Sequence, residues 1–329
     1  AYGHGLLPIA KHLHSLGVKY YAVARPEEAL SLRKALSSAH ILILSPVPTD
    51  FFPKMVRNDI TLTLANSGDL RKLAQVAKRE KLTAKIHLKI DTGLNRAGLN
   101  PSEADQFIQE LSQHSGIKLE GVFTHFADSG NNDKFTRQQI NIFEKKALSI
   151  KKIYPKILLH AANSGAIFKF PKAHFDLVRP GLALYGHLPF KSKKIKLKPL
   201  LSLQTQINRI HLVKKGETVS YDRTFRVNKD LLVATIIAGY ADGIRRSPLP
   251  WPHTQINGQL APIIGLISMD QTTLNISRIK KAPTLKTLVT LLSEKGPCSL
   301  EAIALRIGTS PYEVLTGLSE SRIARVYYF

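Results

Sequence analysis

Short β-rich runs alternate with amphipathic helical segments from Gly5 to about Leu200, and this alternation constrains the fold more than any other feature. Strands that alternate with helices form βαβ units, and such units pair their strands in parallel. The expected helices include Leu6–Leu16, Pro26–Leu36, Asp69–Lys81, Pro101–Gln113 and Thr136–Ile153. The expected strands are Lys19–Val23, Ile41–Leu44, Ile60–Leu64, Lys85–Ile90, Gly121–Phe126, Ile157–His160 and Leu182–Tyr185.

The number of strands decides between two parallel-sheet architectures. Seven candidate strands are visible, and the loop-like stretch Ala1–Gly5 should follow an eighth strand that the sequence does not contain. Eight parallel strands make a (β/α)₈ barrel, whose active site lies at the carboxyl ends of the strands. We therefore expect an α/β barrel of the TIM type over residues 1–200, with its first strand missing. A doubly wound open sheet is the alternative.

After about Leu200 the pattern changes to short strands separated by turns rich in Gly, Pro and Asp. We expect residues 201–329 to form a second, mostly-β domain, and a chain of 329 residues is long enough for two domains. Two short helical segments, Ser299–Ile307 and Tyr312–Ser319, end the chain. The expected strands are Ser202–Val213, Thr218–Ser220, Leu231–Ile237, Thr254–Ile256, Ile263–Ile267 and Thr287–Leu292.

The chain carries a formal net charge of +23, which could mark a nucleic-acid-binding surface. Its lysines are spread along the sequence, and this pattern favours a basic, solvated surface. The two C-terminal helical segments could form a DNA-binding helix–turn–helix, but the second carries Glu313 near its start and offers no Lys or Arg before Arg322. We interpret the pair as a packing hairpin and expect no nucleic-acid partner.

The sequence also limits where the protein works. No apolar run is long enough to span a membrane, and no signal peptide is visible. The single cysteine, Cys298, excludes an internal disulfide framework and fits a reducing, cytoplasmic location. We expect neither a membrane partner nor a metal site.

The first candidate binding element is the stretch Ala1–Gly5, where two glycines bracket His4 directly before a helical run. Such loops bind anions through free backbone N–H groups, and glycine lets the backbone approach a ligand closely. Tyr2 adds a hydroxyl donor for a phosphate. An ordinary strand-to-helix turn is the alternative interpretation.

Further candidates follow the later strands. Arg96 lies in the turn after the fourth expected strand, where its guanidinium can hold a carboxylate in two hydrogen bonds; a surface ion pair is the alternative. His125 is a candidate orienting group or a core histidine. Ser164 can donate to a phosphate, and Arg179 should face a specific acceptor because an unpaired arginine is rarely buried.

Taken together with two motifs in the second domain, these segments resemble bacterial alanine racemases. The resemblance covers nearly the whole chain. The second-domain motifs place Tyr240 in a glycine-bracketed loop and Met269 after a strand. The motifs are Ala-Tyr-Gly-His-Gly, Asp-Thr-Gly-x-x-Arg-x-Gly, Thr-His-Phe-Ala, Ala-Asn-Ser, Arg-Pro-Gly-x-x-x-Tyr-Gly, Gly-Tyr-Ala-Asp-Gly and Ser-Met-Asp-Gln.

The resemblance implies an amino-acid racemase, an isomerase that interconverts L-alanine and D-alanine by a two-base mechanism and supplies D-alanine for cell-wall peptidoglycan. It implies pyridoxal 5′-phosphate as the cofactor. Arg179 would face the pyridine nitrogen, and His125 would hydrogen-bond Arg179 and orient it. The cofactor phosphate would be held by Tyr2, Ser164 and the backbone N–H groups of Gly181 and Leu182.

The same resemblance implies how the substrate is held. Arg96 would bind its carboxylate, and Lys89 matches a lysine that is often carbamylated to hold that arginine. Tyr240 would be one of the two bases and would reach into the site of a partner subunit. The backbone N–H of Met269 would meet the carboxylate from that subunit, with Asp270 beside it. A homodimer with shared active sites follows.

The second base of this family is a lysine that also forms the Schiff base with the cofactor. It stands four residues before the position of Tyr2, so we expect residues 1–329 to lack it and to be inactive. A pyridoxal-phosphate-binding barrel protein that does not racemise is the alternative function, and a basic nucleic-acid-binding protein is another. The sequence departs from the family pattern at Asn95, Leu266 and Ser321.

Overall fold

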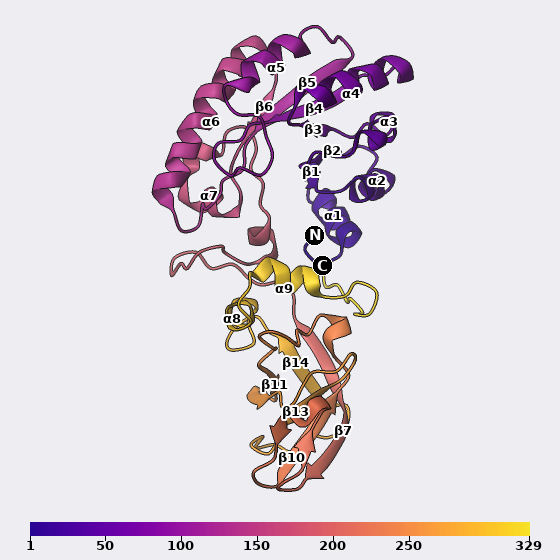
Figure 1. Ribbon diagram of the computed structural model, residues 1–329, viewed down its shortest axis with the longest axis vertical. Helices are drawn as coiled ribbons and strands as arrows, with labels where there is room; N and C mark the ends of the chain where they lie inside the picture. Colours follow the sequence, from indigo (N-terminus) through magenta and orange to yellow (C-terminus); the bar gives the residue numbers. More distant parts are fainter. The chain divides into compact units, whose positions relative to one another are not determined.

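The computed structural model describes residues 1–329, and the chain divides into two compact units. One unit comprises Leu6–Leu197, and the other combines Ala1–Gly5 with Lys198–Phe329. In Figure 1 the first unit runs from indigo to magenta and shows helices around a curved set of strands. The second unit (orange to yellow) is a mostly-β body with short helices.

Six strands of the Leu6–Leu197 unit pair in parallel and in chain order. β1 pairs with β2, and β3 to β6 form one sheet. A single parallel bridge between Leu42 and Thr61 joins β2 to β3. This is the strand order of an α/β barrel, as the sequence predicts. The strands are β1 (Tyr20–Val23), β2 (His40–Ile43), β3 (Leu62–Leu64), β4 (Ala84–Lys89), β5 (Ile117–Phe123) and β6 (Leu158–His160).

The helices of this unit lie around the outer side of the strands (Figure 1). The longest, α6, has 21 residues and buries only the stripe of side chains that faces the strands. No helix of the structure is long and apolar enough to cross a membrane. The helices are α1 (Leu6–Ser15), α2 (Pro26–Ala35), α3 (Phe52–Arg57), α4 (Ser67–Glu80), α5 (Glu103–Leu111), α6 (Asp133–Ile153) and α7 (Ser164–Lys169).

Helix α4 illustrates how the sequence sets these boundaries. The Asn66 side chain caps its start by accepting the Asp69 N–H at 2.8 Å. Its buried residues recur at helical spacing, so one face packs against the sheet. The helix ends at Lys81, which adopts the left-handed conformation with φ of 55°. Beneath it, Ile86 and Leu88 of β4 are fully buried, as expected for a strand in a parallel sheet.

The prediction of a seventh strand over Leu182–Tyr185 is wrong, because these residues form the 3₁₀ helix η3. Gly181 and Gly186 bound it, and its backbone N–H groups bond to carbonyls three residues back. This pattern is incompatible with an extended strand. The parallel pairing beyond β6 is made instead by Leu177, which bridges to His160.

The second unit contains a six-stranded antiparallel sheet with the order β12-β11-β14-β7-β10-β13 and a small β8–β9 ribbon. Two short helices, α8 (Leu300–Arg306) and α9 (Pro311–Gly317), follow the sheet. The strands are β7 (Leu203–Val213), β8 (Thr218–Val219), β9 (Phe225–Arg226), β10 (Leu231–Ile236), β11 (His253–Ile256), β12 (Gln259–Pro262), β13 (Thr272–Asn275) and β14 (Leu288–Leu292).

One expected strand of this unit is also wrong. The run Ile263–Ile267 is not a strand, since Gly265 has φ of 67° and interrupts the extended backbone. The strand β12 lies just before it and is paired with β11 through a two-residue turn. That turn is Asn257-Gly258, with φ values of 50° and 76°, and such Asn-Gly turns match the twist of a hairpin.

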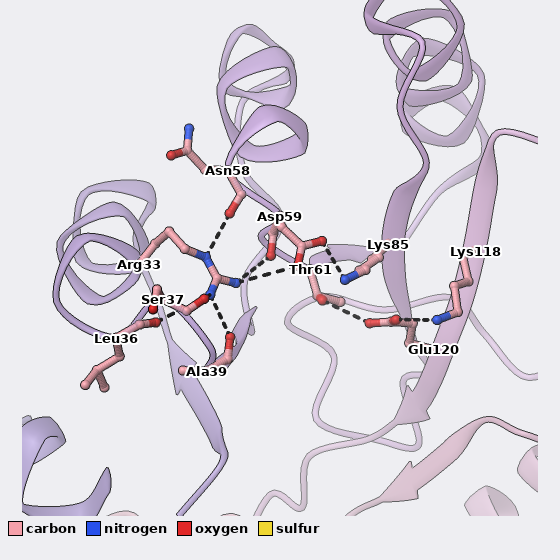
Figure 2. A network of polar contacts seen from close by, with 10 residues as sticks. All are labelled: Arg33, Leu36, Ser37, Ala39, Asn58, Asp59, Thr61, Lys85, Lys118 and Glu120. Atoms are coloured by element: carbon pink, nitrogen blue, oxygen red, sulfur yellow. Dashed lines mark hydrogen bonds and ion pairs between the residues drawn. The ribbon is translucent and has the colours of Figure 1, made fainter.

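The amino ends of β2 to β5 are tied together by polar contacts, which Figure 2 shows. The Arg33 side chain is 15% exposed, and its guanidinium donates to the backbone carbonyls of Asn58 at 2.9 Å, Ala39 at 2.9 Å and Asp59 at 2.8 Å. Asp59 also pairs with Lys85 of β4. Because this end of a barrel lies opposite the active site, we expect the network to serve stability.

Replacing Arg33 with methionine should therefore lower the free energy of unfolding by about 2–4 kcal/mol, because several half-buried carbonyls lose a charged donor. Urea denaturation measures this. Arg25→Met is the matched control: its side chain is 77% exposed and pairs only with Glu27, so about 0.5 kcal/mol or less is expected. Equal losses in the two variants would contradict the role of Arg33.

Candidate active site

The turn after β4 is organised by one carboxylate. Asp91 accepts four backbone N–H groups at 2.8, 2.9, 3.1 and 3.2 Å, from Gly93, Leu94, Asn95 and Arg96. Burial raises the pKa of Asp91, but these backbone donors outweigh it and lower the pKa overall. Asn95 has φ of 55°, a left-handed conformation that asparagine tolerates, so it can stand where the family pattern has glycine. The turn therefore holds Arg96 in a fixed backbone position.

Cations gather at this carboxyl end of the strands. Lys89 ends β4, Arg96 lies in the turn that follows, and Arg179 follows the bridge to β6. Lys89 is 5% exposed, and its burial together with repulsion by the two arginines lowers its pKa. It makes no ion pair within the chain, and the Asp91 carboxylate is already bound by its own turn. The electrostatics of this edge therefore favour an anionic ligand.

The Arg179 guanidinium is held by acceptors from two strand ends. Its Nη2 donates to the carbonyls of Thr124 at 2.7 Å and Ala161 at 3.1 Å, and its Nη1 donates to His160 Nδ1 at 2.6 Å. It lies over the ring of Phe123 at 5.4 Å. Burial lowers the pKa of Arg179 to about 10, so the group stays charged at neutral pH. This matches the prediction that Arg179 faces specific acceptors.

A second histidine extends this contact into the barrel. His160 Nε2 lies 2.8 Å from His87 Nδ1. Because arginine only donates, His160 Nδ1 must accept the hydrogen bond from Arg179. The ring proton of neutral His160 is therefore on Nε2, which donates to His87 Nδ1. Burial lowers the pKa of His87 to about 4 and that of His160 well below its ordinary value, so both rings are neutral at pH 7. The result is a one-way chain of hydrogen bonds from Arg179 to His160 to His87.

The sequence did not single out His87 or His160 as site residues. A signal was available, since His87 and Lys89 are two residues apart on β4 and therefore project from the same face of the strand. His160 ends β6 directly before the small residues that precede Ser164. Only the pairing of strands shows that the two rings meet.

The expected hydrogen bond between His125 and Arg179 is not formed, and His160 occupies that place. The cause is local geometry: Leu177 bridges to His160, so Arg179, two residues further on, projects from the same face toward His160. His125 is half-buried and follows Thr124, whose carbonyl accepts from Arg179. Burial and the neighbouring cations lower its pKa to about 3, so it too is neutral. Its role in the site stays a prediction.

The Ser164 hydroxyl is the shared acceptor of two backbone N–H groups that follow Arg179 in the chain. The Ser164 side chain is 3% exposed, and its Oγ accepts the N–H groups of Gly181 at 2.9 Å and Ala183 at 3.2 Å. Leu182 begins the 3₁₀ helix η3, so its N–H has no carbonyl partner within that helix. The structure thus places Gly181 directly against Ser164, with Leu182 next in the chain; that these residues bind a phosphate, as the family resemblance implies, stays a prediction.

The second unit brings its own predicted residues together. Tyr240 N–H donates to the Ser268 carbonyl at 3.0 Å, and Ala241 N–H donates to the Met269 carbonyl at 2.9 Å. Tyr240 and Met269 are 42% and 56% exposed, and Asp270 is also exposed. The two motifs therefore form one exposed edge that carries the Tyr240 side chain, Met269 and the single carboxylate of Asp270.

Tyr2 belongs to this second unit as well. Its ring meets the ring of Tyr312 edge-on, with centroids 5.0 Å apart. The loop around it is held by residues of the same unit, since Tyr327 donates its hydroxyl to the His4 carbonyl at 3.1 Å. The predicted site residues therefore form two groups, each placed within its own unit.

The class of protein is thus a parallel α/β barrel whose strand ends carry a cation cluster, an arrangement that favours small anionic ligands. Comparisons with known proteins specify the family. The sequence matches the alanine racemase N-terminal domain over residues 1–189 and the alanine racemase C-terminal domain over residues 200–327. The chain belongs to the alanine racemase family, whose members are isomerases.

Individual relatives agree with this assignment. "Alanine racemase 2" of Caldanaerobacter subterraneus is 37% identical and covers 100% of this chain and 86% of its own length. The alanine racemase of Clostridium difficile 630 superposes with a TM-score of 0.91 at 34% identity, covering 97% of this chain and 84% of that one. The Bartonella henselae alanine racemase, solved with covalently bound pyridoxal phosphate, gives 0.88 at 28% identity, covering 97% and 88%.

The buried histidines predict an acid-sensitive fold. Their folded pKa values lie below the ordinary value of 6.5, so their contribution is complete above about pH 6.5 and is lost as pH falls toward 4. Each such histidine should steepen the fall of the unfolding free energy by about 1.4 kcal/mol per pH unit. His87→Gln should therefore show a shallower slope than the parent between pH 6.5 and 5 in urea titrations. Identical slopes would mean that His87 is not held neutral in the folded protein.

Proposed function

We propose that the protein interconverts L-alanine and D-alanine with pyridoxal 5′-phosphate as its cofactor and supplies D-alanine for peptidoglycan. The observation that carries this proposal is the anchored Arg179 guanidinium beside the donor group of Ser164 and Gly181. A charged arginine next to converging hydroxyl and N–H donors fits a ligand that carries both a pyridine ring and a phosphate.

The residues present fit this cofactor. Ser164 and the N–H groups of Gly181 and Leu182 would bind the phosphate, because a phosphate oxygen can replace the Ser164 oxygen as acceptor of the Gly181 N–H, and the Leu182 N–H has no carbonyl partner within η3. Tyr2 would add its hydroxyl. Pyridoxal phosphate, when bound, withdraws electrons from the α-carbon of an amino acid and so weakens its C–H bond.

Arg179 would face the pyridine nitrogen. A guanidinium with a pKa of about 10 keeps its proton, so it would leave that nitrogen unprotonated and limit its pull on electrons. Side reactions such as transamination would then be disfavoured. The acceptors from Thr124, Ala161 and His160 would hold the guanidinium in this orientation, since they use both of its terminal nitrogens.

Arg96 would bind the substrate carboxylate at the mouth of the barrel, where its turn is fixed by Asp91. Lys89 would be carbamylated to hold Arg96. Two features support this: the amine is buried without an ion-pair partner, and its lowered pKa favours the neutral form that reacts with carbon dioxide. A carbamate would also replace a buried positive charge by a negative one between two arginines.

Tyr240 would act as one of the two bases that flank the α-carbon, and a homodimer would bring it into the partner subunit's site. Its exposure, and that of Met269 and Asp270 on the same edge, supports a surface that a partner covers. The backbone N–H of Met269 would meet the substrate carboxylate there. The single, buried cysteine supports a cytoplasmic location, which we propose with the function.

The family's second base is a lysine whose position precedes Tyr2 by four residues. Within residues 1–329, Lys89 is the lysine that the structure places at the carboxyl end of the strands, and it would compete for the cofactor only if its amine were not carbamylated.

The proposed reaction predicts the effect of one substitution at Arg179. The natural gene product should form D-alanine from L-alanine and show the absorbance of bound pyridoxal phosphate. Arg179→Glu should slow racemisation by roughly 100-fold or more and make transamination detectable, because a carboxylate would let the pyridine nitrogen take a proton. Arg278→Glu, an exposed arginine of the other unit, should change neither. Unchanged rate and specificity in Arg179→Glu would reject the assignment.

Attachment of the cofactor can be mapped directly. After borohydride reduction of the protein with its cofactor and proteolysis, mass spectrometry should not find the reduced cofactor on Lys89, because a carbamylated amine cannot form a Schiff base. Lys11 lies on α1 and Lys19 precedes β1, away from the carboxyl ends of the strands. A modified Lys89 would show that this chain uses an internal lysine and would overturn the assignment of both Lys89 and the base.

A further inference from the structure

The segment after α9 contacts two loops that carry proposed site tyrosines. Arg322 Nε donates to Asp242 Oδ1 at 2.8 Å, and Asp242 lies two residues after Tyr240. Three residues further on, Arg325 Nε donates to the Gly3 carbonyl at 2.9 Å, next to Tyr2. All of these residues belong to the same compact unit.

The Asp242 carboxylate links the Tyr240 loop to the C-terminal segment. One carboxylate oxygen accepts the Gly239 N–H at 2.8 Å, and the other receives Arg322. The Asp242 side chain is 15% exposed, whereas Arg322 is 43% exposed and reaches it from the surface. The Asp242 carbonyl also accepts the Ser319 N–H at 3.3 Å. The C-terminal segment therefore holds Asp242 on one side of Tyr240, and Asp242 in turn holds Gly239 on the other side.

The Tyr2 loop is held in a parallel way by a different arginine. Arg325 Nη1 donates to the carbonyls of Glu320 and Ile323 at 3.1 and 3.3 Å, so the guanidinium is fixed by its own segment before it reaches Gly3. Gly3 has φ of 77°, and an added Cβ would lie closer to the Leu315 carbonyl oxygen than any side chain allows. The loop is thus seated against the end of α9.

We propose that Arg322 and Arg325 are positioning residues with separate targets: Arg322 fixes the loop of Tyr240, and Arg325 fixes the loop of Tyr2. Neither arginine is expected to touch substrate or cofactor. Their consequences for catalysis rest on the proposed function, in which Tyr240 is a base and Tyr2 binds the phosphate. Arg322 should therefore act on proton transfer, and Arg325 on cofactor affinity.

The first test is amide hydrogen exchange, which does not depend on activity. In Arg322→Met, amides of residues 239–244 should exchange roughly fivefold faster, while those of residues 2–5 stay unchanged, because an exposed charge-assisted contact is lost at one loop only. Arg325→Met should give the reverse pattern. Arg322→Lys keeps a cation beside Asp242 and should stay within about twofold of the parent. Arg278→Met is the control.

The second test measures function in the same variants. Arg322→Met should leave the Kd for pyridoxal phosphate, measured by fluorescence quenching, within about twofold. It should slow solvent-deuterium incorporation into one alanine enantiomer more than into the other, since each base serves one face. Arg325→Met should weaken cofactor binding by roughly fivefold and slow both enantiomers equally at saturating cofactor or not at all.

The outcomes separate this inference from the proposed function. If both loops exchange faster in each variant, or neither loop changes, the two arginines do not hold separate loops and the inference is wrong. If the parent protein does not racemise alanine, the proposed function fails, while the exchange pattern still decides whether the two arginines hold separate loops.

Discussion

A guanidinium donates from every nitrogen and accepts at none, and this property orders the interior of the α/β unit. Arg179 forces His160 to accept at Nδ1, which leaves the His160 proton for His87. Burial supports the same arrangement, because it keeps both rings neutral and so leaves each with one acceptor. A protonated His160 would set two donors against each other. One charge at the strand ends therefore fixes the tautomers of two rings deeper in the barrel.

This chain of hydrogen bonds depends on packing between neighbouring strands as much as on charge. Its members come from β4, β6 and the segment after β6, with β5 between. A side chain at Gly121 of β5 would collide with the His87 ring, since an added Cβ would lie 2.6 Å from His87 Nδ1. The glycine leaves the space that the ring fills. The rings of Phe123 and His160 are stacked, with centroids 4.8 Å apart.

The sequence predicts the barrel because its β-rich runs alternate with amphipathic helical segments. It singles out Arg96 and Ser164 because each follows an expected strand, and Arg179 because it lies beside a Pro-Gly turn. It fails where a short apolar run fits two structures: Leu182–Tyr185 suits a strand or a turn of helix, and only its flanking glycines decide. It also misses His87 and His160, because their contact arises from the register of parallel strands, which a single sequence does not contain.

The glycines around Tyr2 and Tyr240 serve close contact between backbones of the same unit. From the sequence we expect the glycines beside Tyr2 to let the backbone approach a ligand. In the structure an added Cβ at Gly239 would overlap the backbone of Ser268 and Met269, and one at Gly3 would overlap the backbone of Leu315. Each glycine therefore lets one backbone pass against another within the same unit. Close contact between backbones leaves few ways for a loop to shift. The backbone position of the adjacent tyrosine is therefore set by the fold and does not require a bound ligand.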